Sequence, residues 1–373
     1  SPMMQQYFDI KKQHPDKILF FRLGDFYEMF YDDAILASKE LELTLTGRDC
    51  GQEERAPMCG VPFLSYENYV ARLIAKGYKV AICEQMEDPA LSKGLVKRDI
   101  IRVVTPGTVI ESSMLQDDKN NYIASIYITE KKAGVCFADV STGTAHATLL
   151  TGEKLGPEII SELCRYSPSE VLFNAAILDY KEVTAYIKQQ LACSVELLDE
   201  AAFAPDACME EMRAQFGDAP EKTAGLAPES PAFTALAVLL GYLKETQKMG
   251  VERLKTVHNY AEAQYMQLSP VTRANLELTE TMRGREKKGT LLWVLDKTQT
   301  AMGKRLMRAW IEQPLVNVAA INARLDGVEE LVGDSVARAD IAAALSKIFD
   351  IERLMTRTVY GSASPREIYA LAA

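Results

Sequence analysis

The first hundred residues alternate between short apolar runs and segments in which apolar residues recur at helical spacing. The apolar runs are too short for typical helices, so they predict buried strands. Strands are expected at 18–21, 43–46, 78–83 and 100–105, and helices at 1–14, 32–42 and 65–77. An alternation of this kind predicts a mixed sheet packed with helices.

The stretch at 24–30 follows the first of these strands and combines chemically opposite side chains. If its backbone is extended, Phe26 and Glu28 point to the same side, because side chains alternate across a strand. An aromatic wedge and a hydrogen-bond acceptor would then project together, which is the chemistry needed to enter a base stack. The alternative is that Phe26, Tyr27 and Phe30 are core aromatics and Glu28 is solvated. The spacing alone favours this alternative.

Two neighbouring segments hold further candidates for contacts with a nucleic acid. Residues 57–63 carry Met58 and Gly60 between prolines and predict a stiff loop, for which a simple packing turn is the alternative. Residues 47–54 are polar and also predict a loop. Arg48 and Arg55 lie in and just after this loop and are candidates for phosphate contacts.

The pattern changes after residue 110, so the 373 residues predict more than one domain. Strand pairs and then helix–strand alternation predict an α/β domain, and helical spacing from residue 231 onward predicts helices alone. The expected organisation is a mixed α/β domain at 1–110, a linker at 111–121, an α/β domain at 122–250 and an all-α domain at 251–373.

Asp139 ends a predicted strand and precedes a Ser-Thr-Gly turn. Ribonuclease H-like nucleases place an Asp in this way, but their chemistry needs several carboxylates around Mg²⁺. No second or third carboxylate stands at a fixed spacing from Asp139, so a structural turn is favoured. The seven cysteines contain no CxxC pair, which gives no indication of a zinc site and fits a reducing cytoplasm. No catalytic residue and no metal site is therefore predicted.

The net charge of −10 is unevenly distributed along the chain. Residues 1–110 hold 14 Lys and Arg against 16 Asp and Glu, and residues 251–373 hold 17 against 15. Residues 111–250 hold 11 against 21. The acidic middle is the part least suited to a phosphate backbone and is better suited to protein contact. No apolar stretch approaches the roughly 20 residues that span a bilayer, so no membrane role is expected.

One segment has the spacing of a phosphate-binding loop without its chemistry. Gly284 and Gly289 are correctly spaced, but Thr290 and Leu291 follow where Lys and then Ser or Thr are required. The segment also follows no predicted strand. We therefore expect no ATP hydrolysis by this chain, and the basic residues at 283–288 predict a solvated turn.

Six segments resemble, in order, the MutS family of DNA mismatch-recognition proteins. They are residues 2–7 (PMMQQY), 24–30 (GDFYEMF), 57–62 (PMCGVP), 80–85 (VAICEQ), 103–108 (VVTPGT) and 291–296 (LLWVLD). The resemblance implies a mismatch-recognition domain, a ribonuclease H-like connector domain without nuclease activity and the start of an all-α lever domain.

The resemblance also assigns roles by position. It places the wedge beside a mispaired base at Phe26 and the hydrogen bond to that base at Glu28. The segment with Met58, Gly60 and Pro62 resembles one that lies near the DNA minor groove. Phe63-Leu64 stands where Tyr-His is usual in the family, so a polar contact normally assigned there is not expected.

The end of the chain adds an expectation about its extent. Ser364 and Glu367 form a capping box that opens a helix still running at Ala373, so an N-terminal fragment is expected. In the MutS family a clamp domain and an ATPase domain follow, so ATP and Mg²⁺ are expected as cofactors of the full-length protein and none of this chain. The implied partners are mismatched double-stranded DNA, a MutL-like repair protein on the connector domain and a second copy in the full-length homodimer. The implied location is the cytoplasm, at the nucleoid.

Two other classes stay open beside mismatch recognition. One is a protein-interaction module that docks a repair partner through the acidic residues 111–250. The other is a ribonuclease H-like nuclease built around Asp139.

Overall fold

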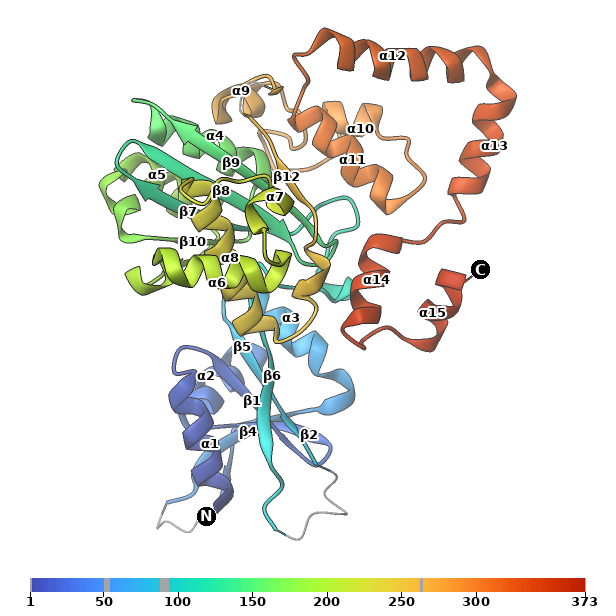
Figure 1. Cartoon of the computed structure of the whole chain (residues 1–373). Coiled ribbons are helices and arrows are strands. Elements are labelled where there is room, and N and C mark those ends of the chain that lie inside the picture. The colour runs from blue at the N-terminus through green and yellow to red at the C-terminus, as the bar shows by residue number, and fades with distance from the viewer. Residues whose placement is uncertain (1, 50–53, 88–93, 262–263, 373) are drawn as a thin grey trace. The chain divides into compact units, whose positions relative to one another are not determined.

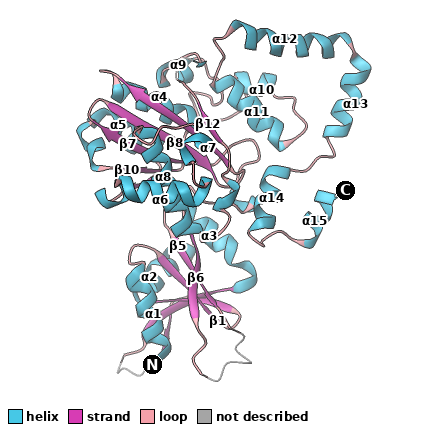
Figure 2. Ribbon diagram, in the orientation of Figure 1, coloured by secondary structure: helices cyan, strands magenta, loops and turns pink. Residues whose placement is uncertain are grey.

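The computed structural model describes residues 2–49, 54–87, 94–261 and 264–372. The chain forms two compact units, Ser1–Met114 with Tyr242–Met249 and Leu115–Gly241 with Gly250–Ala373. Each unit contains a sheet packed with helices, and helices dominate toward the C-terminus (Figures 1 and 2). Ser1, expected to cap the first helix, and residues 50–53 of the segment expected to be a loop lie outside the described residues.

The first unit is built on a mixed sheet with the strand order β3-β4-β2-β1-β5-β6. Strands β1 and β5 are parallel, and the other neighbours are antiparallel. The elements are α1 (Pro2–Gln13), β1 (Ile18–Leu23), β2 (Phe26–Phe30), α2 (Tyr31–Leu41), β3 (Thr46–Arg48), β4 (Ala56–Pro62), α3 (Tyr66–Ala75), β5 (Val80–Gln85) and β6 (Arg98–Val104). The mixed α/β architecture predicted from the sequence is confirmed.

Three local predictions in this unit were wrong. Residues 57–62 of the loop expected at 57–63 belong to strand β4, and the short strand expected at 43–46 is displaced to Thr46–Arg48. That strand also takes Gly47 and Arg48 out of the loop expected at 47–54. Strand β4 accommodates its prolines because each is paired on one side only: Pro57 with Gly47 of β3, and Pro62 with Phe26 of β2. A proline that faces a single neighbour removes no hydrogen bond from a fully paired ladder.

The second unit contains a sheet with the order β11-β10-β7-β8-β9-β12. Strands β7, β8 and β9 are antiparallel, while β10 and β11 continue the sheet in parallel, as expected of a ribonuclease H-like domain. The strands are β7 (Ile123–Thr129), β8 (Lys132–Asp139), β9 (Thr144–Thr151), β10 (Glu170–Phe173), β11 (Ser194–Leu197) and β12 (Val257–Asn259). The helices between them are α4 (Leu155–Tyr166), α5 (Lys181–Tyr186), α6 (Pro205–Phe216), α7 (Pro220–Ala224) and α8 (Pro231–Gln247).

The core of this sheet shows why helices cover it so closely. Ile159 and Leu163 of α4 are fully buried against Phe137 of β8 and its neighbours. Beside the start of α8, β8 carries Gly134. A Cβ at that position would lie 2.0 Å from the backbone carbonyl of Pro231, so any larger residue would push helix and sheet apart.

The remaining helices follow in sequence toward the C-terminus. They are α9 (Pro270–Asn275), α10 (Leu291–Leu295), α11 (Ala301–Glu312), α12 (Val318–Gly333), α13 (Ser335–Leu345), α14 (Ile351–Val359) and α15 (Pro365–Ala372). The predicted capping box at the start of α15 is confirmed, because Glu367 accepts from the Ser364 amide at 2.7 Å and Ser364 accepts from the Glu367 amide at 3.4 Å. The expectation of helices alone after residue 231 was wrong at β12, which pairs with the edge of β9. Its three residues, Val-His-Asn, are too few to show the alternation of a strand, so only the pairing with β9 defines it.

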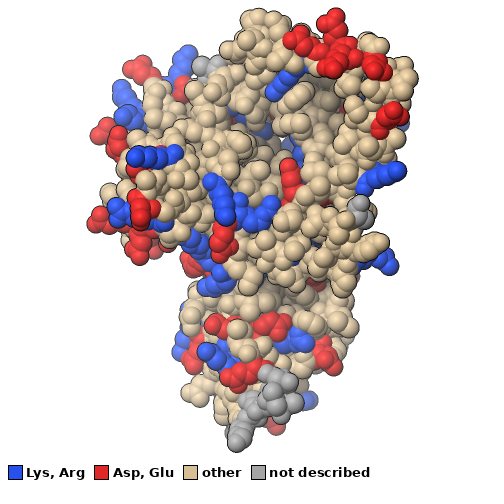
Figure 3. Space-filling view, turned by 45° about the vertical axis from the view of Figure 1, so that its right-hand side comes forward, with Lys and Arg blue, Asp and Glu red and all other residues tan. Residues whose placement is uncertain are grey.

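The face drawn in Figure 3 carries both basic and acidic side chains, with a small group of basic ones near its middle and a group of acidic ones at the top right. In the described part of the chain, no helix is both long enough and apolar enough to cross a bilayer.

A partly buried histidine of β9 lies where β12 pairs with the second sheet. His146 of β9 lies beside His258 of β12 with their ring centroids 5.1 Å apart. Burial, assisted by the nearby His258, lowers the pKa of His146 to about 4. The unfolded chain therefore binds this proton more readily, and the stability present above about pH 6.5 is lost as the pH falls from there toward 4.

We expect His146→Gln to reduce this acid sensitivity. The variant lacks the group that must be protonated, so between pH 7 and pH 5 it should lose about 1–2 kcal/mol less of its unfolding free energy than the parent. Urea unfolding of both proteins at the two pH values measures the difference. An equal loss in both would assign the acid sensitivity to other groups.

Candidate nucleic-acid interface

Strand β2 sends its side chains alternately to the two faces of the first sheet. Tyr27 and Met29 face one side and are 1% and 0% exposed. Phe26, Glu28 and Phe30 face the other side, and there Phe26 is 46% exposed while Phe30 is fully buried. The backbone is extended here, which was the condition set in the sequence analysis, and it puts the aromatic ring and the carboxylate on one face.

The pairing with β4 explains why this face is closed at one end and open at the other. Phe30 pairs with Met58, and both pack in the core cluster that contains Met4 and Tyr7 of α1. At the other end of the strand Phe26 pairs with Pro62, and both side chains are exposed. Met58 therefore lies at the packed end and is partly buried, whereas Pro62 lies at the open end.

Gly60 of β4 lies beside both Glu28 and Phe26. It pairs with Glu28, and a Cβ at Gly60 would lie 3.3 Å from the carbonyl oxygen of Tyr27 and 3.5 Å from Cγ of Glu28. The same Cβ would lie 3.8 Å from the ring of Phe26. The missing side chain leaves room for both residues on this part of the sheet.

Glu28 has a cationic partner on the same face. Arg48 of β3 donates to its carboxylate at 2.6 Å, and the two side chains are 38% and 18% exposed. An ion pair this accessible contributes about 0–1 kcal/mol to stability, so its main effect is to orient and neutralise the carboxylate. Of the two arginines named from the sequence, Arg48 thus lies at the site, whereas Arg55 lies exposed before β4.

A polar network behind β2 was missed by the sequence analysis. Tyr27 donates a hydrogen bond to Glu84 at the end of β5, and Arg22 lies 3.3 Å from the same carboxylate oxygen. Burial and the Glu84 carboxylate raise the pKa of Tyr27 far above its usual value, so the hydroxyl stays a donor. The available signal was a carboxylate directly after the apolar run at 80–83.

The turn after β4 has an apolar tip. Phe63 lies under the Arg22 guanidinium, whose carbon is 3.4 Å from the ring centroid, and stacks with Tyr66. Leu64 next to it is 95% exposed. Where the family usually has Tyr-His, this chain therefore presents a packed aromatic ring and an open leucine.

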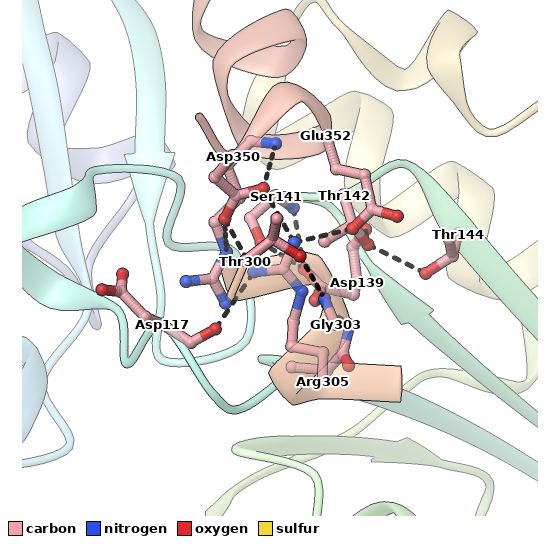
Figure 4. A network of polar contacts seen from close by, with 12 residues as sticks. Asp117, Asp139, Ser141, Thr142, Thr144, Thr300, Gly303, Arg305, Asp350 and Glu352 are labelled. Carbon is pink, nitrogen blue, oxygen red and sulfur yellow. Dashed lines mark hydrogen bonds and ion pairs between the residues drawn. The ribbon is translucent and has the colours of Figure 1, made fainter. Parts of the chain in front are cut away.

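Asp139 has a structural role, because both of its carboxylate oxygens accept hydrogen bonds from neighbouring residues. One carboxylate oxygen accepts from the amide and hydroxyl of Ser141 at 2.9 and 2.6 Å, and the other accepts from Asn120 and the Asn121 amide at 2.8 and 3.1 Å. The side chain is fully buried at the turn shown in Figure 4. Among the described residues no group of three or more His, Cys, Asp and Glu is placed to hold a metal. The geometry supports the structural-turn interpretation over a nuclease site.

The fold and the site together define a class: a multidomain protein with an α/β domain that presents an exposed aromatic ring beside a partly buried carboxylate, followed by a ribonuclease H-like sheet and helices. The chain belongs to the MutS family. The profiles of MutS domain I, MutS domain II and MutS domain III match residues 1–113, 121–256 and 271–373.

Curated relatives agree with these matches. The DNA mismatch repair protein MutS of Ruminiclostridium cellulolyticum is 50% identical over 371 residues, which is 100% of this chain and 42% of the relative. Proteins of the same name from Acetivibrio thermocellus and Clostridium tetani are 48% and 46% identical, again over 100% of this chain and over 42% and 41% of the relatives. The chain thus spans about two fifths of the length of the relatives that it matches.

We expect Gly60→Val to damage the site. A Cβ there would lie 3.3 Å from the Tyr27 carbonyl oxygen and already touch Cγ of Glu28, so the larger side chain must displace its neighbours and should cost about 1–3 kcal/mol of unfolding free energy. Urea unfolding measures the loss, and Gly94→Val is the matched control, because a Cβ there meets no atom within 4 Å. Equal stability of the two variants would show that the space at Gly60 is not required.

We expect Asp139→Asn to destabilise the chain without affecting any cleavage. In either orientation the new amide nitrogen faces a hydrogen-bond donor, which should cost about 1–3 kcal/mol. Urea unfolding against the exposed control Asp179→Asn measures this cost. Cleavage of DNA or RNA that depends on Mg²⁺ and disappears in the variant would contradict the structural role.

Proposed function

We propose that this chain recognises mismatched or looped-out bases in duplex DNA as the first step of mismatch repair. The observation that carries the proposal is the open end of β2, where Phe26 and Glu28 project from one face while the strand around them is buried. The family profile that covers this unit is that of MutS domain I.

Phe26 acts as a wedge. Separating two stacked base pairs costs a few kcal/mol, and the cost is lower where pairing is already defective. A ring held on a rigid strand therefore enters a mismatch at a lower cost than it enters a matched duplex. The Tyr27–Glu84 hydrogen bond and the buried Met29 hold this strand from behind.

Glu28 supplies the contrast between mismatched and matched DNA. A carboxylate near phosphates is repelled unless a base edge donates a hydrogen bond to it. In the free chain Arg48 compensates this charge at 2.6 Å. When a displaced base becomes the donor to Glu28, Arg48 is free to bind the phosphate backbone. Glu28 and Arg48 thus change partners in the same step.

Fewer observations on this chain bear on the other expected properties, which are nucleotide binding, dimerisation and partner docking. We propose that ATP and Mg²⁺ binding and homodimerisation belong to the longer protein, and that a MutL-like partner docks on the second unit. For docking, the support is the charge of residues 111–250 and the edge strand β11, whose Val195 and Leu197 are about half exposed. Binding of DNA by this chain alone is expected to be weak, because affinity depends largely on neutralised phosphates and the chain carries −10.

We expect Phe26→Ala and Glu28→Ala to fail in different ways. Loss of the ring removes a stacking contact of about 1–3 kcal/mol, so affinity for a mismatched duplex should fall about 5- to 150-fold with little change for a matched duplex. Loss of the carboxylate removes a repulsive charge, so affinity for the matched duplex should rise and the ratio of the two affinities should approach one.

Fluorescence anisotropy with otherwise identical mismatched and matched duplexes, at one fixed salt concentration, measures both ratios. Phe8→Ala is the matched control, because Phe8 is an aromatic residue of the same unit that is 40% exposed on α1. If the ratio of mismatched to matched affinity is unchanged in both variants, Phe26 and Glu28 have only a structural role.

A further inference from the structure

Residues 116–121, which we call the strap, are held along their length by side chains from the rest of the second unit. Arg353 of α14 donates to the carbonyl oxygens of Gln116 and Lys119 at 2.8 and 2.6 Å. From α11, Arg305 donates to the carbonyl of Asp117 at 3.2 Å and Arg308 to that of Asp118 at 3.1 Å. Three guanidinium groups thus bind four backbone carbonyls of a segment that the sequence predicts to be a linker.

The other end of the strap is tied to the sheet. Asn120 and the amide of Asn121 donate to the buried carboxylate of Asp139, at 2.8 and 3.1 Å. The hydroxyl of Ser169 donates to the Asn121 side chain at 2.7 Å. The strap therefore links α11 and α14 to the turn after β8.

The Arg305 guanidinium is also held by carboxylates outside the strap. Arg305 makes a two-pronged contact with Asp350 at 2.7 and 2.8 Å and a third contact with Glu352 at 2.7 Å (Figure 4). The side chains of Arg305, Arg308 and Arg353 are 4%, 9% and 4% exposed. A planar guanidinium fixed in this way loses little freedom when it binds a further acceptor.

The strap contributes one carboxylate of its own to this arrangement. Asp118 accepts from Lys287 at 3.0 Å and lies 3.6 Å from Arg308. Lys287, one of the basic residues at 283–288 expected to form a solvated turn, is also bound to Asp296 at 2.7 Å. The adjacent Asp117 offers a contrast, because its carboxylate makes no hydrogen bond in the described part of the chain and points away from Arg305 in Figure 4.

We propose that the strap is an electrostatic latch that fastens α11 and α14 to the second sheet and opens as a unit. Its contacts are made by charged groups to backbone carbonyls, whereas the sheet itself is held by an apolar core. Loss of the guanidinium contacts should therefore release the strap while the sheet remains folded. While the strap is bound, a displacement of the chain at Leu115 also moves α11 and α14. A flexible linker would not transmit such a displacement.

Hydrogen–deuterium exchange of the whole chain without DNA tests the latch. Arg353→Gln should raise exchange in peptides that cover 115–122 and the start of α14 about tenfold or more, with β7, β8 and β9 still protected. Asp118→Asn should raise exchange in the strap about threefold, because it removes one ionic contact and keeps all three arginines. Asp117→Asn removes the same charge one residue earlier but breaks no hydrogen bond and weakens only a longer-range attraction to Arg353, so exchange in the strap should rise by less than about twofold.

Two outcomes would overturn the proposal. One is unchanged strap exchange in Arg353→Gln. The other requires two results together. In Arg353→Gln, strands β7, β8 and β9 lose protection along with the strap, and Asp118→Asn shows the same exchange as Asp117→Asn. Because no DNA is present, failure of the latch is distinct from failure of the mismatch proposal, which appears only in the ratio of duplex affinities.

Discussion

The register between β2 and β4 is the constraint on which the exposed site depends. It pairs Phe26 with Pro62 and Glu28 with Gly60, and so puts the ring, the carboxylate and the open space between them on one face. A slip of one residue would turn each of these side chains to the opposite face. Burial prevents that slip, because it would expose Tyr27 and Met29, which are 1% and 0% accessible.

The two faces of β2 therefore have complementary roles. The side with Tyr27 supplies rigidity through apolar packing and the hydrogen bond to Glu84, while the side with Phe26 leaves a large aromatic ring exposed. An exposed ring on a well-packed strand needs no ordering when it meets a partner, so little conformational entropy is lost on contact. Arg48 adds the electrostatic counterpart by keeping Glu28 oriented and compensated in the free chain.

The second unit uses charge in a different way. Its sheet is held by apolar burial, but the path of the chain into that sheet is held by guanidinium groups on backbone carbonyls. Asp139, which has the sequence context of a metal ligand, serves this path by accepting from Asn120 and Asn121. A carboxylate whose acceptors are all occupied by protein donors has nothing left for a cation.

The sequence by itself determined the α/β beginning, the helical end and most helix limits, and it showed that an extended backbone would put Phe26 beside Glu28. These follow from apolar periodicity, caps and side-chain alternation, which are local properties. Only the tertiary structure decided that residues 57–62 form a strand, that Arg48 binds Glu28 and that Arg353 binds the strap. Each of these depends on a partner far away in sequence: β2 and β3 pair with β4, and Arg353 reaches a carbonyl 237 residues earlier. No local pattern encodes such a contact, because it exists only once the chain has folded around it.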